Sequence, residues 1–201
     1  MAAQPPQDVE EHIKALYHTY RHAPSPSSKG LFFSPTCLQI CRPVPSYSAT
    51  SRAQIVQYLQ DAERGKAPLK SNDVDSESDE IKESPVASKD PSHDADTAYY
   101  TIRPLQPSEH TFGSELATSA IGHTSATLKM KAEAEGWIGM RVDLWDEGSE
   151  HALLVKVQYW WRLEAERDEE DGDVWRQCLH DIMYLGPRDG TEGTEGVEIL
   201  R

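Results

Sequence analysis

Three segments of alternating apolar and polar residues constrain the fold of this chain most strongly. They are WIGMRVDLW at Trp137–Trp145, LLVKVQYWWRL at Leu153–Leu163 and WRQCLHDIMYL at Trp175–Leu185. A period of two is typical of strands, and polar residues at alternate positions favour antiparallel strands with one wetter face. The short turn at 146–148 and the acidic run 164–173 predict hairpins between them. We therefore expect a mainly antiparallel sheet in the C-terminal half.

Two amphipathic helices are predicted before this sheet. Asp8 followed by Glu11 resembles a capping box for the first, and Ser51 with Gln54 matches one for the second, which we expect to end at Gly65. Apolar residues then recur at helical spacing, which predicts one buried face on each helix. These stripes are Val9, Ile13, Leu16, Tyr17 and Tyr20, and then Ile55, Tyr58, Leu59 and Ala62.

Weaker patterns predict three further elements. Leu38, Ile40 and Arg42 alternate with polar or small residues, which indicates a strand that Pro43 stops or confines to a sheet edge. Residues 98–105 predict another strand. Residues 124–135 predict a short helix that ends at a glycine.

Composition divides the chain into ordered and unordered parts. Residues 66–96 hold nine acidic and four basic side chains with almost no large apolar residue. Such a segment cannot bury enough surface to offset a chain entropy of about 1–2 kcal/mol per residue. We expect one domain over 1–201, with 66–96 as a disordered acidic insertion. Residues 187–201, which repeat Thr-Glu-Gly, are expected to form a flexible tail.

Charge and cysteine content exclude several classes of function. The net charge is −14 and the 20 basic residues are scattered, which argues against nucleic-acid or anionic-membrane partners. Three cysteines give no disulfide framework. No signal peptide and no membrane-spanning run is recognisable, so the expected compartment is the cytosol or nucleus.

The order of these elements resembles the nuclear transport factor 2-like superfamily, which includes the SnoaL-like cyclases. VEEHIKALYHTY and SRAQIVQYLQDA carry the resemblance in the helices, and GMRVDLWDE, LLVKVQYWWRLE and WRQCLHDIMYL carry it in the sheet. The resemblance implies an α+β fold in which N-terminal helices pack on a strongly curved, mainly antiparallel sheet enclosing an apolar pocket. Members use that pocket as cyclases, dehydratases, isomerases, epoxide hydrolases or non-catalytic binders, so fold alone does not decide function.

Three side chains are candidates for proton transfer in such a pocket. Arg141 and Asp143 share a strand face, and Asp143 would act as the base with Arg141 as electrostatic stabiliser. His180, on a face with Cys178 and Tyr184, would be a second acid or base. The alternative is a solvated Arg–Asp pair and a core histidine bonded to a carbonyl.

Four aromatic residues are candidate ligand contacts: Tyr17, Tyr58, Trp160 and Tyr184. Aromatic residues at helical spacing are more often core, so this assignment has a structural alternative. Because Trp160 and Trp161 are adjacent, one of them should be exposed on the sheet face, where it would mark a homodimer surface.

Metal and cofactor sites are not expected. Cys37, Cys41, Cys178 and His180 could be offered as a zinc set, but one intervening residue between the last two does not suit the usual ligand spacing. The first functional hypothesis is a cofactor-independent isomerase, dehydratase or cyclase acting on a small apolar molecule. The second is a non-catalytic dimeric scaffold that binds a ligand or a protein. If Arg141 and Asp143 line a closed pocket with His180, the enzyme hypothesis is favoured. If Ile138, Met140 and Val142 line the pocket, the binding hypothesis is favoured.

Overall fold

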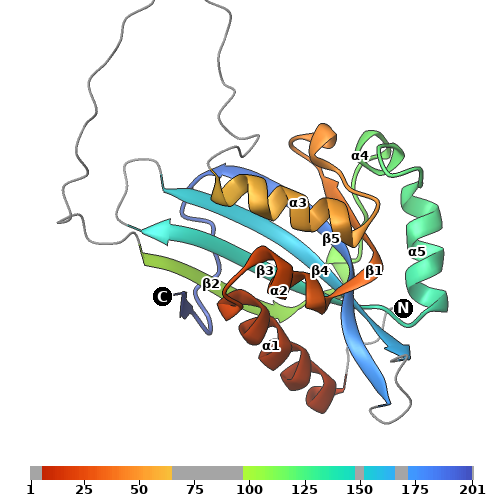
Figure 1. Ribbon diagram of the computed structural model, residues 1–201, viewed down its shortest axis with the longest axis horizontal. Helices are drawn as coiled ribbons and strands as arrows, with labels where there is room; N and C mark the ends of the chain where they lie inside the picture. Colours follow the sequence, from red (N-terminus) through yellow and green to blue (C-terminus); the bar gives the residue numbers. More distant parts are fainter. Residues whose placement is uncertain (1–5, 65–96, 148–151, 166–171, 201) are drawn as a thin grey trace, which may run out of the picture.

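The computed structural model describes residues 6–64, 97–147, 152–165 and 172–200, and within them six strands form one mixed sheet (Figure 1). The predicted acidic insertion at 66–96 lies outside the described residues. The strand order is β1-β5-β4-β3-β2-β6, and only the β1–β5 pair is parallel. The strands are β1 (Phe33–Cys41), β2 (Thr97–Pro104), β3 (Ile138–Glu147), β4 (Leu153–Ala165), β5 (Asp173–Pro187) and β6 (Glu198–Leu200). This confirms the predicted α+β class with a mainly antiparallel sheet, which does not close into a barrel.

The inner face of the sheet, as we call the face covered by α1 (Gln7–His22) and α3 (Arg52–Glu63), holds the larger core. Ile13 and Tyr17 of α1 and Ile55 of α3 are buried against Met140 and Val142 of β3. These are the apolar stripes that helical spacing and strand alternation predicted. The remaining strand side chains of this core are Tyr100, Val157, Tyr159, Trp161 and Ile182.

The helix starts agree only in part with the predicted caps. At α3 the Ser51 hydroxyl accepts a hydrogen bond from the Gln54 N–H, as predicted. At α1 the cap position is Pro6, which offers no side-chain bond. Asp8 therefore lies inside the first turn, where its charge meets the positive end of the helix dipole. The capping box predicted for α1 was wrong.

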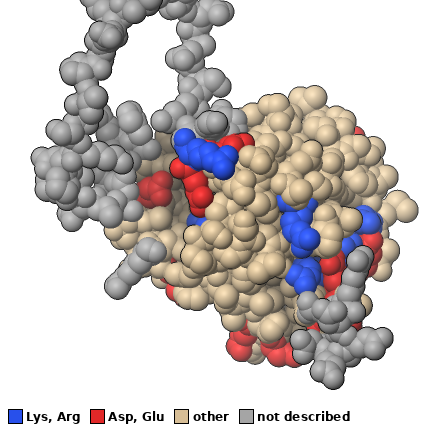
Figure 2. Space-filling model, viewed as in Figure 1, with Lys and Arg blue, Asp and Glu red and all other residues tan. Residues whose placement is uncertain are grey.

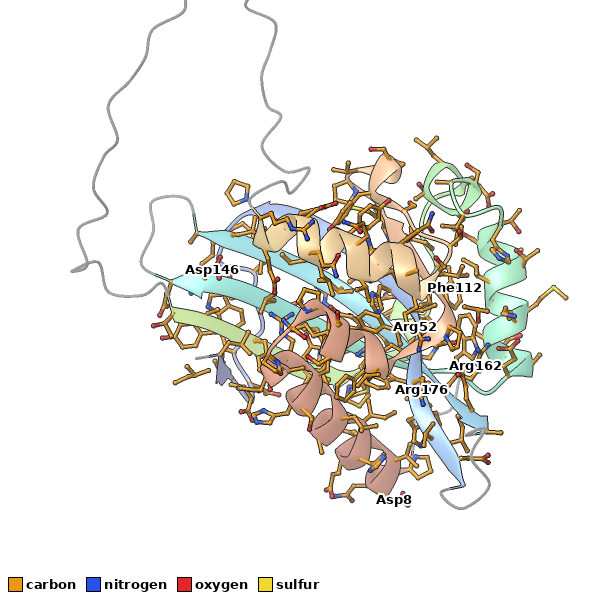
Figure 3. All side chains as sticks on the ribbon, in the orientation of Figure 1. Asp8, Arg52, Phe112, Asp146, Arg162 and Arg176 are labelled. Carbon is orange, nitrogen blue, oxygen red and sulfur yellow. The ribbon has the colours of Figure 1, made fainter. Side chains whose placement is uncertain are left out.

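The outer face is covered at one end by α4 (Glu115–Ser119) and α5 (Ser125–Ala134), which enclose a second core. Trp160 lies in this core, stacked on Phe112 with ring centroids 4.6 Å apart. Phe112 is labelled beside α5 in Figure 3. Both Trp160 and Trp161 are buried, so the prediction that one of the pair is exposed was wrong. The chain's own helix covers the surface that was expected to mark a dimer interface.

Two β-bulges in β5 change which side chains share a face. The pairing moves from Trp161 opposite Gln177 to Trp160 opposite Leu179, so Cys178 has no partner position on β4. A second register shift lies between Lys156, which pairs with Tyr184, and Val157, which pairs with Ile182. Met183 therefore also has no partner position on β4. A bulge bends a strand and raises its twist, and β5 curves visibly in Figure 1.

The C-terminal segment lies across the rest of the outer face. β6 pairs antiparallel with β2, the Gly193 N–H donates to Asp143, and Lys156 donates to the Thr191 carbonyl. The sequence had predicted a flexible tail here, because glycine and charged residues without periodicity give no strand signal. The contacts depend on polar groups of the sheet that a local pattern cannot reveal.

Four short elements join the larger ones: α2 (Pro26–Lys29), η1 (Gly30–Phe32), η2 (Pro45–Tyr47) and η4 (Pro107–Glu109). In the parts of the chain that the structure describes, no helix has the length and apolar character needed to cross a membrane. On the face drawn in Figure 2, basic side chains lie in small separate groups and form no continuous stripe.

Candidate functional site

A layer of aromatic rings fills the space between α1 and the inner face. Tyr17 is fully buried, and its ring centroid lies 5.2 Å from that of Tyr159 on β4. Tyr20 packs 5.6 Å from Phe33 at the start of β1. Figure 3 shows side chains of α1 filling the space between this helix and the strands behind it. We call the polar and aromatic residues of this layer the interior cluster: Tyr17, Tyr20, Arg21, Phe33, Tyr159, Trp161, Gln177 and His180.

His180 lies at the centre of the interior cluster. Its ring makes edge-to-face contacts with Tyr159 and Phe33, at centroid distances of 4.8 and 4.9 Å. His180 Nε2 lies 2.7 Å from Gln177 Oε1, and because an amide oxygen only accepts, the imidazole carries its proton on Nε2. Burial lowers the pKa of His180 to about 3, so the ring is neutral at pH 7.

The phenol groups of the cluster are also neutral. Burial raises the pKa of Tyr17, of Tyr20 and of Tyr159, so all three keep their protons at neutral pH. At the solvent end of the layer, Arg21 is half-buried and its guanidinium lies 6.0 Å from the Tyr20 ring centroid. Arg21 is therefore the member of the cluster that carries a full charge.

Four buried polar atoms of the interior cluster have no hydrogen-bond partner among the described residues. They are Tyr17 Oη, Arg21 Nε, Trp161 Nε1 and Gln177 Nε2, of which the Tyr17 hydroxyl makes no hydrogen bond of normal geometry but interacts with the Tyr159 side chain. A buried polar group left unpaired costs about 1–3 kcal/mol. Buried polar groups in native proteins nearly always have a partner, and where the protein supplies none, a water or a ligand does. The donors of the cluster therefore need a partner other than a described side chain, either a buried water or a ligand.

Arg141 and Asp143 lie together on the outer face, as their spacing predicted. Arg141 Nε donates to Asp143 Oδ1 at 2.7 Å, and the Gly193 N–H donates to Asp143 Oδ2 at 3.0 Å. The sheet separates this pair from His180, because position 180 faces α1. The structure therefore does not bring together the three residues that the sequence had grouped for proton transfer.

A second ion pair lies beside Arg141 on the outer face. Arg103 donates to both carboxylate oxygens of Glu109, at 2.6 and 2.7 Å. The hydrogen bond from Arg103 lowers the pKa of Glu109 to about 2. Gln158 then donates to the Glu109 carbonyl at 2.8 Å. These contacts fix the segment around η4 over the sheet.

The four predicted ligand contacts separate in the structure. Tyr17 lies in the interior cluster, and Trp160 lies in the second core, on the outer face of the sheet. The Tyr58 hydroxyl donates to the Ser48 carbonyl at 3.0 Å, at the edge of α3. Tyr184 faces outward because of the bulge at Met183, and its hydroxyl donates to the Pro187 carbonyl. The bulge at Cys178 places that side chain on the outer face, and the bulge at Met183 does the same for Tyr184. The prediction that His180 shares a face with Cys178 and Tyr184 was therefore wrong.

The three cysteines are free and buried. Burial raises the pKa of each thiol, which opposes thiolate chemistry. The described residues contain no group of three or more His, Cys, Asp or Glu side chains placed to hold a metal ion.

Of the interior cluster, sequence reasoning named only Tyr17 and His180 as candidate site residues. Alternation did place Tyr159 and Trp161 on one strand face, and the helical stripe did include Tyr20. Gln177 could not be assigned, because its facing depends on the bulge at Cys178. Arg21 lies beside the apolar stripe of α1, and nothing in the local pattern distinguishes it from a solvated arginine.

Comparison with protein-family models matches residues 2–201 to a family described as SnoaL-like domain. A search of curated proteins and a search of solved structures found no match.

Proposed function

The chain belongs to the SnoaL-like domain family, and from this we propose that it binds a small molecule with an apolar body at the interior cluster, where the rings packed between α1 and the inner face of the sheet separate to admit it. Members of this superfamily are pocket proteins. The residues of this chain that would contact the ligand are the rings of Tyr17, Tyr159 and Phe33, together with His180 and Gln177.

The observation that carries this proposal is the group of unpartnered polar atoms on Tyr17, Arg21, Trp161 and Gln177. Tyr17, Trp161 and Gln177 are each fully buried. A core selected only for stability would replace such groups with apolar ones of similar shape, since an unpaired polar group costs free energy and its apolar replacement does not. Their presence beside aromatic walls fits a site with apolar sides and a few placed polar contacts.

Binding is favoured over the proton-transfer chemistry of an isomerase, dehydratase or cyclase. A general acid or base works best with a pKa near the working pH, and the pKa of His180 is far below that range. Asp143, the expected base, has both carboxylate oxygens bonded on the outer face. Its contacts with Arg141 and Gly193 fit a structural role in holding the C-terminal segment.

The test compares Tyr17→Phe with the wild type in two measurements. Calorimetric titration with acetylnaphthalene, a neutral aromatic ketone, should give saturable binding to the wild type that weakens about tenfold in the variant, the value of one lost hydrogen bond in a dry site. Urea unfolding should show the variant within about 1 kcal/mol of the wild type, because the removed hydroxyl interacts with Tyr159 but makes no hydrogen bond of normal geometry among the described residues.

Tyr99→Phe is the matched control. Tyr99 stacks on Trp145 at 5.9 Å on the opposite face, so its variant should bind as the wild type does. Equal weakening in both variants, or a Tyr17→Phe protein destabilised by more than about 1 kcal/mol, would contradict the proposal. The second result would mean that the hydroxyl is already bonded in the folded protein.

A further inference from the structure

We infer that the ligand of the interior cluster carries an oxyanion, such as a carboxylate, which binds beside Arg21 and Tyr17 at the solvent end of α1. This inference rests on the proposed function and adds the chemical class of the ligand.

The unpartnered atoms of the cluster are hydrogen-bond donors. Arg21 Nε, Trp161 Nε1 and Gln177 Nε2 can only donate, and the Tyr17 hydroxyl, which interacts with the Tyr159 side chain, can donate or accept. Elsewhere in the described chain the unpartnered atoms are mixed: Trp160 Nε1 is a donor, Gln158 Oε1 and Glu192 Oε2 are acceptors, and the Ser48 hydroxyl can act as either. A donor-only lining is satisfied by a molecule rich in acceptor oxygens.

The charge at this end of the cluster is positive. Among the described residues, Arg21 makes no ion pair with a carboxylate. Lys29 of α2 is a second nearby cation: burial lowers its pKa, the charge of Arg21 lowers it further, and Glu63 opposes this shift. The neighbours of Arg21 within the layer, Tyr17, Tyr20 and Tyr159, are neutral phenols. A partly buried guanidinium without a counter-charge is stabilised by an anion from outside the chain, and such charge-assisted bonds are the stronger ones.

The arrangement also indicates how such a ligand would lie. The half-buried Arg21 marks the end open to solvent, whereas Trp161 and Gln177 lie at the fully buried positions of β4 and β5. Between the two ends, the Tyr20 ring packs on the rings of Phe33 and Tyr159, at centroid distances of 5.6 and 6.3 Å. An aromatic acid is the class of ligand that we propose, with its carboxylate at Arg21.

The experiment titrates the wild type and Arg21→Gln with two probes of similar shape, naphthoate and acetylnaphthalene, at neutral pH and low salt. We expect naphthoate to bind the wild type about tenfold more tightly than the ketone, and to lose about that factor in Arg21→Gln. The affinity for the ketone should change less than about twofold in this variant. Arg21→Lys keeps the charge and should recover part of the preference, although it lacks the planar donor fork.

Arg64→Gln is the control, since Arg64 lies at the end of α3 with 59 % of its side chain exposed. Its variant removes one positive charge without touching the cluster and should keep the wild-type preference. Equal binding of both probes, or a preference for naphthoate that survives Arg21→Gln, would overturn the inference and leave the proposed function standing. Failure of both probes to bind would overturn the proposed function together with it.

Discussion

Replacing Asp181 by asparagine should destabilise the fold more than any other single polar change we can name. Asp181 is fully buried on the outer face. Arg42 Nε donates to Asp181 Oδ1 at 2.9 Å, Arg42 Nη2 donates to Oδ2 at 2.7 Å, and the Gly113 N–H donates to Oδ2 at 3.0 Å. The carboxylate thus joins β1, β5 and the segment before α4.

The expected loss follows from these three bonds. Asp181→Asn places an amide N–H₂ against a donor of either Arg42 or Gly113, and it leaves the Arg42 charge, 28 % exposed, without its partner. Breaking a buried ion pair by removing one member costs about 3–5 kcal/mol. Asp61→Asn is the matched control: Asp61 pairs with Arg64 at 3.6 Å on the surface of α3, and such pairs contribute about 0–1 kcal/mol.

Urea unfolding of Asp181→Asn, Arg42→Gln and the double variant measures the effect and its origin. The two single losses should not add, and the double variant should be less destabilised than their sum by about 2 kcal/mol or more. Additive losses, or a loss below about 1 kcal/mol for Asp181→Asn, would refute the argument. The pair would then be solvated and would not hold the segment around Gly113.

Two further predictions concern His180 and Gly139. Burial lowers the pKa of His180 to about 3 from an ordinary 6.5, so its neutral form contributes fully above pH 6.5 and the contribution is lost as the pH falls toward 3. Wild-type stability measured relative to His180→Gln should therefore fall by about 3 kcal/mol between pH 6.5 and about pH 4.5, and parallel pH profiles would contradict this. In Gly139→Ala, the new Cβ would overlap Leu105 Cδ1 and lie 3.0 Å from the Trp160 ring, so urea unfolding should show a loss of about 1–3 kcal/mol in the free energy of unfolding. A variant as stable as the wild type would mean that the Leu105 side chain moves aside at little cost in the second core.

The sequence predicted β3 and β4 well, because each is a long run with an unbroken period of two. It also predicted α5 and the Ser51 cap, since both depend on neighbouring residues alone. It failed at β5, where Cys178 and Met183 each add one residue opposite β4. Whether a strand accommodates such a residue depends on the partner strand and on what packs against it, and neither is visible in the local pattern. The same limit explains Trp160, whose burial depends on Phe112 and α5, far away along the chain.

The bulges also determine which polar residues serve structure and which are left for binding. Between them, positions 179–182 regain strict alternation, so Asp181 faces outward to Arg42 while His180 faces inward to Tyr159. Outside, Asp143 and Asp181 each have both carboxylate oxygens bonded by donors from the chain. Inside, Trp161 and Gln177 present donors that no described residue accepts. Adjacent residues of one strand thus meet opposite conditions: the chain bonds both carboxylate oxygens of Asp181, whereas His180 lies among buried donors of Trp161 and Gln177 that no described residue accepts.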